Sequence, residues 1–479
     1  MLLRVIGILL VIESGFMLLP TAVSAFYHEA DFRIFAGTAA LTLVSGLLMI
    51  FAIRPSEKEM GKREGFMLTA LVWVFFSIFG MIPFILGSPG LLVSEAFFES
   101  MSGFTTTGAS VLINVDTLSH GIHIWRSLMQ WIGGMGIILF TLAVLPMLNS
   151  AGGMQMFNAE VTGITHDKLK PRVSQTAKRL WGIYTLLTII LFLLLYIGPM
   201  DLFDAVCHAL STMSTGGFST RNDSIATWES NYVKIVLTIF MFIGGINFAL
   251  FYKAAAGRPR EAWSNEAFRT YVRMILVMYI IFATVLFING QGKNFETLFV
   301  DPIFQIVSTI TSTGYTASNF ENWGTFVLML VFIMMFFGAC AGSTSGGAKI
   351  DRCLYFLKNT RNEIYRVMHP TSVLPVKVNG KVIEPEIVSK VTAFLGIYIM
   401  VITIGAVVLT LFNIPLVDSF FASFSCVSNT GLGAGITGYG GNYDIIPPAG
   451  KWVLSFLMLT GRLELFTVIV LFSPGFWKR

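Results

Sequence analysis

The chain has 479 residues, of which 54% are hydrophobic and only 12% are charged, and its formal net charge is +5. A soluble domain carries roughly 25% charged residues, so this composition excludes an ordinary soluble enzyme or binding domain. Stretches without Asp, Glu, Lys or Arg, such as 68–86 and 394–412, approach the ~20 residues that cross a bilayer. The composition therefore predicts a protein with several membrane spans.

Residues 1–60 predict two spanning helices. The start, Met1-Leu-Leu-Arg4 followed by an apolar run, resembles a secretory signal, but it lacks a small-x-small cleavage site at the expected place. A second apolar segment, 34–53, follows soon after. We therefore expect both segments to remain as transmembrane helices that precede the rest of the fold.

Four short segments that resemble one another come next, and each centres on a Thr-Gly pair that ends in Gly108, Gly216, Gly314 or Gly431. An acidic residue lies 13 positions before the glycine in three segments and 12 positions before it in the second; these residues are Glu95, Asp204, Asp301 and Asp418. An acid suits the N-terminus of a helix, so capping is the simpler interpretation, with ion attraction as the alternative. About three turns separate acid and glycine, too few to cross a bilayer, which predicts a re-entrant pore helix.

Two longer apolar segments flank each pore helix, at about 66–86, 180–197, 273–288 and 391–412 before it, and 122–148, 232–252, 324–347 and 451–472 after it. The pattern predicts an all-α polytopic membrane protein with ten spans, in which four helix–pore-loop–helix repeats surround a central pore with pseudo-fourfold symmetry. The predicted boundaries are 1–60 for the N-terminal helices and 61–165, 166–260, 261–370 and 371–479 for the repeats.

The basic residues predict the orientation. If the N-terminus is cytoplasmic, 25 of the 32 Lys and Arg residues lie on the cytoplasmic side and six on the outer side, as the positive-inside rule requires. We therefore expect both termini in the cytoplasm, Thr-Gly loops that open outward, and a position in the plasma membrane among its lipids. The same asymmetry explains the net charge without a nucleic-acid partner.

The four Thr-Gly loops are the candidate ion-binding site, because glycine lets backbone carbonyls face an axis and a carbonyl ring replaces the hydration shell of a monovalent cation. No charged residue flanks the Thr-Gly pairs, which argues against a divalent-cation or anion pore. The lining suits K⁺ best and leaves Na⁺ open. The predicted selectivity filter consists of Thr106, Thr107, Gly108, Ser214, Thr215, Gly216, Ser312, Thr313, Gly314, Asn429, Thr430 and Gly431, with K⁺ at the four Thr-Gly pairs.

With these motifs, the chain resembles the Trk/Ktr/HKT superfamily of potassium transport proteins over essentially its full length, and the two extra N-terminal helices resemble the Trk branch. Some members that pass sodium have serine at the first filter position, so Gly108 favours potassium. The resemblance implies uptake of K⁺ in a bacterial inner membrane, a homodimer, and no organic cofactor in this chain. It also implies a separate cytosolic nucleotide-binding ring that docks on basic loops such as 168–179 and 349–390.

A glycine-rich run at 338–347 interrupts the last helix of the third repeat, since each glycine costs about 1 kcal/mol in a helix interior. A nucleotide-binding P-loop is excluded, because Lys349 does not directly follow Gly347 and no strand precedes the run. The resemblance implies an intramembrane gating loop, and a small-residue packing face is the alternative. The predicted gate residues are Gly342, Ser343, Thr344, Ser345, Gly346 and Gly347.

Arg462 lies in the middle of the last apolar segment, where a charge is costly and normally faces a cavity or a partner. Glu464 is a poor partner, since residues two apart point away from each other on a helix. The resemblance implies a pore-facing arginine that bonds the gating loop and raises the barrier to permeation.

Two other classes of protein are alternatives. A secondary transporter that couples potassium or sodium to H⁺ or Na⁺ also has broken helices, but inverted repeats are expected there. A membrane-embedded enzyme needs a catalytic dyad or a set of metal ligands, and the sequence shows neither, so no enzymatic activity is expected.

Overall fold

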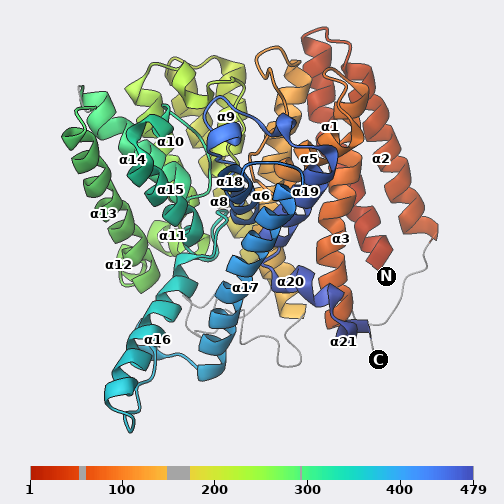
Figure 1. The fold of residues 1–479 in the computed structure, drawn as a ribbon. Helices are drawn as coiled ribbons and strands as arrows, with labels where there is room; N and C mark the ends of the chain where they lie inside the picture. The colour runs from red at the N-terminus through yellow and green to blue at the C-terminus, as the bar shows by residue number, and fades with distance from the viewer. Residues whose placement is uncertain (1, 53–60, 148–172, 292–293, 478–479) are drawn as a thin grey trace.

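The computed structural model describes residues 2–52, 61–147, 173–291 and 294–477. Helices α1 (Leu2–Phe26) and α2 (Phe32–Ala52) form an antiparallel pair at one edge of the bundle (Figure 1). Gly7 and Gly46 let the two backbones approach, because a Cβ on either would lie 2.7 Å from the carbonyl oxygen of the other. These are the two predicted N-terminal helices.

Each of the four repeats begins with a long helix and continues with a short one. The long helices are α3 (Lys62–Gly80, extended by α4, Ile82–Leu86), α8 (Val173–Ile197), α13 (Glu266–Ile288) and α17 (Pro385–Thr410). The short helices are α5 (Val93–Phe104), α9 (Leu202–Met213), α14 (Asp301–Ile310) and α18 (Leu416–Ser428). With 10 to 13 residues, the short helices are far below the ~30 Å of a bilayer core, and nearly all of their side chains are buried. The predicted all-α membrane fold with re-entrant helices is confirmed.

The helices that follow the Thr-Gly loops are less regular than predicted. They are α6 (His120–Met147), α10 (Asn231–Gly244) with α11 (Phe248–Ala255), α15 (Thr325–Phe337), and α19 (Pro448–Arg462) with α20 (Phe466–Ile469). The chain bends by 105° between α10 and α11 and by 113° after α19, so the segments 232–252 and 451–472, each predicted as one helix, are broken helices. Six helices are long and apolar enough to span a membrane, and the two bent pairs raise the number to eight in the described residues.

Both bends have a local cause. Asn247 caps α11 by accepting hydrogen bonds from the amides of Ala249 (2.8 Å) and Leu250 (3.4 Å), while its Nδ2 donates to the carbonyl of Ala341 at 2.6 Å. After α19, Glu464 and Leu465 adopt positive φ angles of 61° and 46°. A right-handed α-helix requires negative φ angles, so α19 cannot continue through these residues.

On the predicted cytoplasmic side, α16 (Ile350–Met368) projects beyond the bundle (Figure 1). The strands β1 (Lys377–Val378) and β2 (Lys381–Val382) pair antiparallel, with Lys377 opposite Val382. Much of the predicted basic loop 349–390 is therefore ordered structure, whereas residues 168–172 of the other predicted basic loop lie outside the described residues. The remaining short elements are η2 (Ser224–Thr227), α12 (Pro259–Trp263), η3 (Glu296–Val300), η4 (Phe320–Trp323), η5 (Gly435–Thr437), η6 (Tyr443–Ile445), η7 (Val470–Phe472) and α21 (Pro474–Trp477).

Candidate ion pathway

The four Thr-Gly loops (105–109, 214–218, 311–315 and 428–432) share one backbone conformation after their short helices. In each, a non-glycine residue has a φ of 51–53°, and a glycine two residues later has a φ of 71–83°. The first set consists of Thr106, Thr215, Ser312 and Asn429, and the second of Gly108, Gly217, Gly314 and Gly431, called here the ring glycines. The four loops are therefore equivalent in structure, residue by residue.

This equivalence corrects the alignment of the second repeat. Gly217, not Gly216, corresponds to the other ring glycines, and Gly216 takes the place of Thr107, Thr313 and Thr430. The residue before each ring glycine donates its amide to a carbonyl five residues earlier, from Gly216 to Ser211 at 2.9 Å as from Thr107 to Ser102. With this register the acidic residue lies 13 positions before the ring glycine in all four repeats, Asp204 included. The spacing of 12 between Asp204 and Gly216 indicates that an alignment on Thr215-Gly216 is one residue out of register.

The ring glycines bring the four loops together around one axis. A Cβ on Gly108 would collide with the carbonyl oxygen of Gly216 in the second loop. The same collision recurs from Gly217 to Thr313, from Gly314 to Thr430 and from Gly431 back to Thr107. The contacts run from repeat one through four and close on the first, so the loops form a ring that only glycine permits at these positions. All twelve predicted filter residues lie in these loops.

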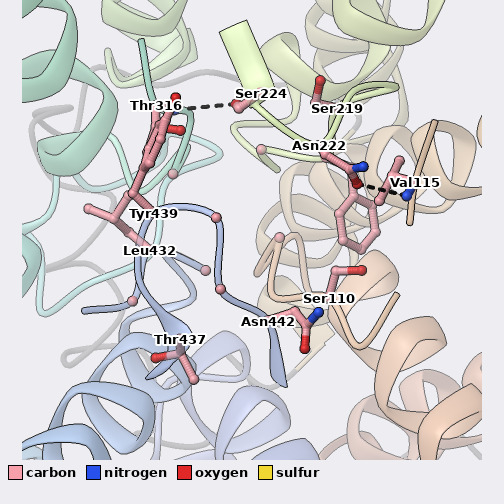
Figure 2. A pocket seen from close by; sticks show the side chains of 18 of the residues that line it. Ser110, Val115, Ser219, Asn222, Ser224, Thr316, Leu432, Thr437, Tyr439 and Asn442 are labelled. Atoms are coloured by element: carbon pink, nitrogen blue, oxygen red, sulfur yellow. Dashed lines mark hydrogen bonds between the residues drawn. The ribbon is translucent and has the colours of Figure 1, made fainter. Parts of the chain in front are cut away.

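A hollow of about 310 Å³, called here the outer hollow, lies on one side of this ring and is lined by all four ring glycines. Residues that follow the glycines in the four repeats surround it, among them Ser110, Asn222 and Thr316 (Figure 2). Hydrogen bonds join neighbouring repeats at its wall: the Val115 amide donates to Asn222 Oδ1 at 2.8 Å and the Thr316 amide to Ser224 Oγ at 3.3 Å. An ion in the hollow therefore faces the ring directly.

Of the four acidic residues predicted to cap the short helices, only Glu95 does so; Asp201 rather than Asp204 caps α9, and α14 and α18 have no side-chain cap. Some of the acids form ion pairs that the sequence did not predict. Glu95 accepts from the Leu92 amide at 3.1 Å and is paired at 2.9 Å with Lys451 of the fourth repeat. Asp301 is paired at 2.7 Å with Lys234 of the second repeat. In the second repeat Asp204 binds Arg221 in the outer loop, and this hydrogen bond raises the pKa of the guanidinium. The Glu95–Lys451 and Asp301–Lys234 pairs therefore join neighbouring repeats.

We expect loss of the Lys234–Asp301 pair to destabilise the fold. Lys234→Met leaves the buried Asp301 carboxylate with no counter-charge, so the free energy of unfolding in mixed micelles should fall by about 3 kcal/mol. Lys234→Met combined with Asp301→Asn should recover most of that loss. Lys358→Met is the matched control, because Lys358 is paired with Glu266 at the surface and should matter by less than ~1 kcal/mol. Equal losses for the two lysines would contradict a structural role for the buried pair.

The predicted gating loop, residues 338–347, lies in the break between α15 and α16; the whole break, residues 338–349, is called here the glycine-rich loop. It contacts the Thr-Gly loops on the side away from the outer hollow. The Gly347 amide donates to the Ser428 carbonyl at 2.9 Å, and the Gly346 amide donates to Ser312 Oγ at 2.5 Å. Thr215 Oγ1 donates to Thr344 Oγ1 at 3.3 Å. The loop therefore lies against the second, third and fourth repeats at once.

Arg462 is buried and binds this loop. Its Nη1 donates to the carbonyl of Thr344 at 2.8 Å, and its Nη2 donates to the carbonyl of Gly133 in α6 at 3.1 Å. Glu464 is paired instead with Arg352 at 2.6 Å, in line with the expectation that it is no partner for Arg462. The sequence did not predict Gly133 as the second acceptor. Arg462 thus links the glycine-rich loop to the first repeat, so that the loop is connected to all four repeats.

These features define a class: a polytopic membrane transport protein in which four quasi-equivalent units surround a ring of backbone, with a hollow on one side and a loop against the other. The chain belongs to the TrkH family, described as cation transport protein, whose family model matches residues 30–479.

The chain is similar over nearly its whole length to curated and solved relatives. It is 36% identical to the Trk system potassium uptake protein TrkH of Salmonella typhimurium, over 99% of this chain and 98% of that protein. It is 35% identical to the protein of the same name from Escherichia coli K12, with the same coverage. The crystal structure of the potassium transporter TrkH from Vibrio parahaemolyticus matches with a TM-score of 0.92 and 32% identity, covering 100% of this chain and 99% of that one.

Proposed function

We propose that this protein takes up K⁺ across the bacterial inner membrane through the ring of Thr-Gly loops, which acts as a selectivity filter. The observation that carries the proposal is the closed ring in which each ring glycine abuts a carbonyl of the next repeat. A ring of backbone carbonyls is the usual selective ligand set for K⁺. The relatives named above as potassium uptake proteins support the choice of ion.

The filter in this proposal keeps the twelve predicted residues and adds Gly217 as the ring glycine of the second repeat. The C-terminal ends of the four short helices carry a partial negative charge and precede the ring directly, which favours a cation there. No free carboxylate is needed for this attraction.

We further propose that the structure represents a closed pathway, with the glycine-rich loop and Arg462 as the gate. The loop is hydrogen-bonded to the Thr-Gly loops of the second, third and fourth repeats, and the Arg462 guanidinium donates a hydrogen bond to the carbonyl of Thr344 in the loop. A small hollow of about 40 Å³ lies between the loop, Asn429 and Arg462, too small for a hydrated ion to pass. Opening in this proposal means displacement of the loop.

For partners, we propose a homodimer with a cytosolic nucleotide-binding regulatory ring, with both termini of this chain in the cytoplasm. Helix α16 projects beyond the bundle (Figure 1). α16 exposes apolar side chains, among them Leu357 (57%), Ile364 (62%) and Val367 (82%), which suit a protein contact.

The test is ion flux into proteoliposomes, with K⁺, Rb⁺, Na⁺ and Li⁺ compared in the wild type and in Gly108→Ser. We expect K⁺ and Rb⁺ to pass well ahead of Na⁺. Serine at Gly108 would adopt a φ of 82° and press its Cβ on the Gly216 carbonyl, so the K⁺/Na⁺ flux ratio should fall about tenfold or more.

The control is Gly182→Ser on α8, where an added Cβ meets nothing within 4 Å. A K⁺/Na⁺ ratio near one in the wild type would refute the selective filter. Uptake that appears only with an imposed H⁺ or Na⁺ gradient would instead support an ion-coupled transporter.

A further inference from the structure

Three of the four Thr-Gly loops carry a threonine immediately before the ring glycine, and one does not. In those three, the threonine hydroxyl shares a hydrogen bond of 2.8 Å with the hydroxyl two residues earlier; the pairs are Thr107–Thr105, Thr313–Thr311 and Thr430–Ser428. Gly216 has this place in the second loop. Ser214, two residues earlier, donates to the carbonyls of Leu210 (3.0 Å) and Ser211 (2.9 Å), as the equivalent hydroxyls of the other loops donate to carbonyls three or four residues earlier, but Gly216 offers it no hydroxyl partner.

The side chain of Gln130, from α6 of the first repeat, fills the space that a threonine side chain would take in the second loop. A Cβ on Gly216 would lie 2.5 Å from Gln130 Oε1 and would collide with its Cδ. Gln130 Nε2 donates to the Gly216 carbonyl at 2.7 Å. Its Oε1 accepts from Ser211 Oγ at 2.6 Å and from the Phe218 amide at 3.2 Å. The amide is fully buried and bonds the loop on both sides of Gly217.

The other three repeats have a different residue at this position. The helices after the loops align in sequence on Gly133, Gly244, Gly338 and Gly461. A Cβ on Gly133 or Gly461 would collide with the carbonyl of Phe104 or Val427, and one on Gly244 would touch Thr215, whereas Gly338 meets Gly346 of the glycine-rich loop. Three residues earlier stand Gln130, Met241, Met335 and Met458, all buried. Asn429 Nδ2 bonds both the Met458 carbonyl and Thr107 Oγ1, so Met458 lies near a filter threonine of the next repeat. The three repeats other than the first carry methionine at the position of Gln130, and the three loops other than the second carry threonine at the position of Gly216.

We propose that Gln130 is a positioning residue that sets ion specificity by replacing the filter threonine missing from the second repeat. The inference rests on the proposed function, in which the ring is the filter. Gly216 supplies one of the four carbonyls that abut the ring glycines, and Gln130 donates a hydrogen bond to that carbonyl. The combination of glutamine and glycine therefore occurs once, where the other repeats carry methionine and threonine at these positions.

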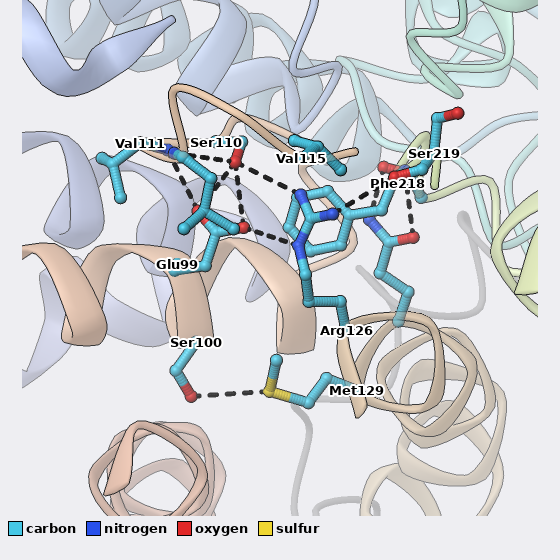
Figure 3. Close-up of polar contacts among 12 residues, drawn as sticks. Glu99, Ser100, Ser110, Val111, Val115, Arg126, Met129, Phe218 and Ser219 are labelled. Carbon is cyan, nitrogen blue, oxygen red and sulfur yellow. Dashed lines mark hydrogen bonds and ion pairs between the residues drawn. The ribbon is translucent and has the colours of Figure 1, made fainter. Parts of the chain in front are cut away.

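Arg126 lies one turn before Gln130 on α6 and contacts the part of the second loop that is nearer the outer hollow. Its guanidinium lies 4.1 Å from the centroid of the Phe218 ring and donates to the Ser219 carbonyl at 3.2 Å (Figure 3). It is paired at 2.9 Å with the buried Glu99. One face of α6 therefore orders the second loop from Gly216 to Ser219.

A double-mutant cycle tests the proposal with K⁺/Na⁺ flux ratios in proteoliposomes. Gln130→Met removes the amide and Gly216→Thr collides with it, so each single variant should lower the ratio about tenfold. The double variant carries methionine and threonine at these two positions, as the other repeats do. Its K⁺/Na⁺ flux ratio should therefore return to within about threefold of the wild type. Gln291→Met is the matched control, because Gln291 is an exposed glutamine in an outer loop.

An unchanged ratio in Gln130→Met, or a double variant no better than the worse single one, overturns the proposal. If the double variant does not fold, Ser211→Ala decides, because it removes one hydrogen bond to Gln130 without adding volume; an unchanged ratio there also overturns the proposal. A buried glutamine with only a structural role would change the yield of folded protein and leave the ratio alone. A wild type without K⁺ preference refutes the filter itself, which separates the two failures.

Discussion

Replacement of Arg462 by alanine should raise K⁺ flux by about tenfold or more. The guanidinium bonds the Thr344 carbonyl in the glycine-rich loop and the Gly133 carbonyl in α6, so the variant frees the loop from the first repeat. A hydrogen bond to a charged group contributes about 1.5–3 kcal/mol, and 1.4 kcal/mol is a factor of ten in an equilibrium. The loss of either bond therefore shifts the balance toward an open loop. Rubidium uptake into proteoliposomes measures the change.

Arg462→Lys tests the hydrogen bonds to the two carbonyls separately from the positive charge. Lysine keeps the positive charge that opposes a passing cation, but a single ammonium does not bridge the two carbonyls as the guanidinium fork does. Flux in Arg462→Lys should therefore lie between the wild type and Arg462→Ala. A monodisperse Arg462→Ala protein with wild-type flux would show that the loop is held by its contacts with Ser312 and Ser428 and not by the arginine.

The repeat architecture could be predicted because its signals are local. Apolar length separates the long helices from the short ones, and the recurring Thr-Gly pair marks each loop. The break between α15 and α16 was predictable in the same way, since a run of glycine and serine interrupts an otherwise apolar helix. The two bends at 245–247 and 463–465 were not predictable, because hydropathy continues through them. The first depends on Asn247, whose partner Ala341 is 94 residues away in the chain.

The register of the second repeat shows a different limit. Residue identity aligned Thr215-Gly216 with the other Thr-Gly pairs, whereas the backbone aligns Gly217 with the ring glycines. Identity misled because the threonine of that loop stands one position early and Gly216 takes its usual place. Gln130 was missed for the same reason: a single glutamine in an apolar helix has no meaning until its partner is known. The useful signal was the spacing from the acidic residue, which is 13 in every repeat only with Gly217.

The corrected register predicts that Gly217→Ala damages ion selectivity far more than Gly216→Ala. Alanine at position 217 must adopt a φ of 83°, at a cost of about 1–2 kcal/mol, and its Cβ collides with the backbone carbonyl of Thr313. That carbonyl belongs to the ring, so it can yield only if the filter deforms. We expect the K⁺/Na⁺ flux ratio to fall about a hundredfold, the equivalent of ~2.7 kcal/mol.

Gly216→Ala differs because Gly216 has no positive φ and its nearest neighbours belong to the Gln130 side chain and not to the backbone of the ring. Its flux ratio should stay within about tenfold of the wild type. Gly290→Ala is the control for backbone strain alone, since Gly290 has a φ of 67° in an outer loop and open space around it. If Gly216→Ala proved the more damaging of the two, Gly216 would be the ring glycine, as residue identity first suggested. Because the two glycines are adjacent, the comparison tests the ring geometry with a single methyl group moved by one residue.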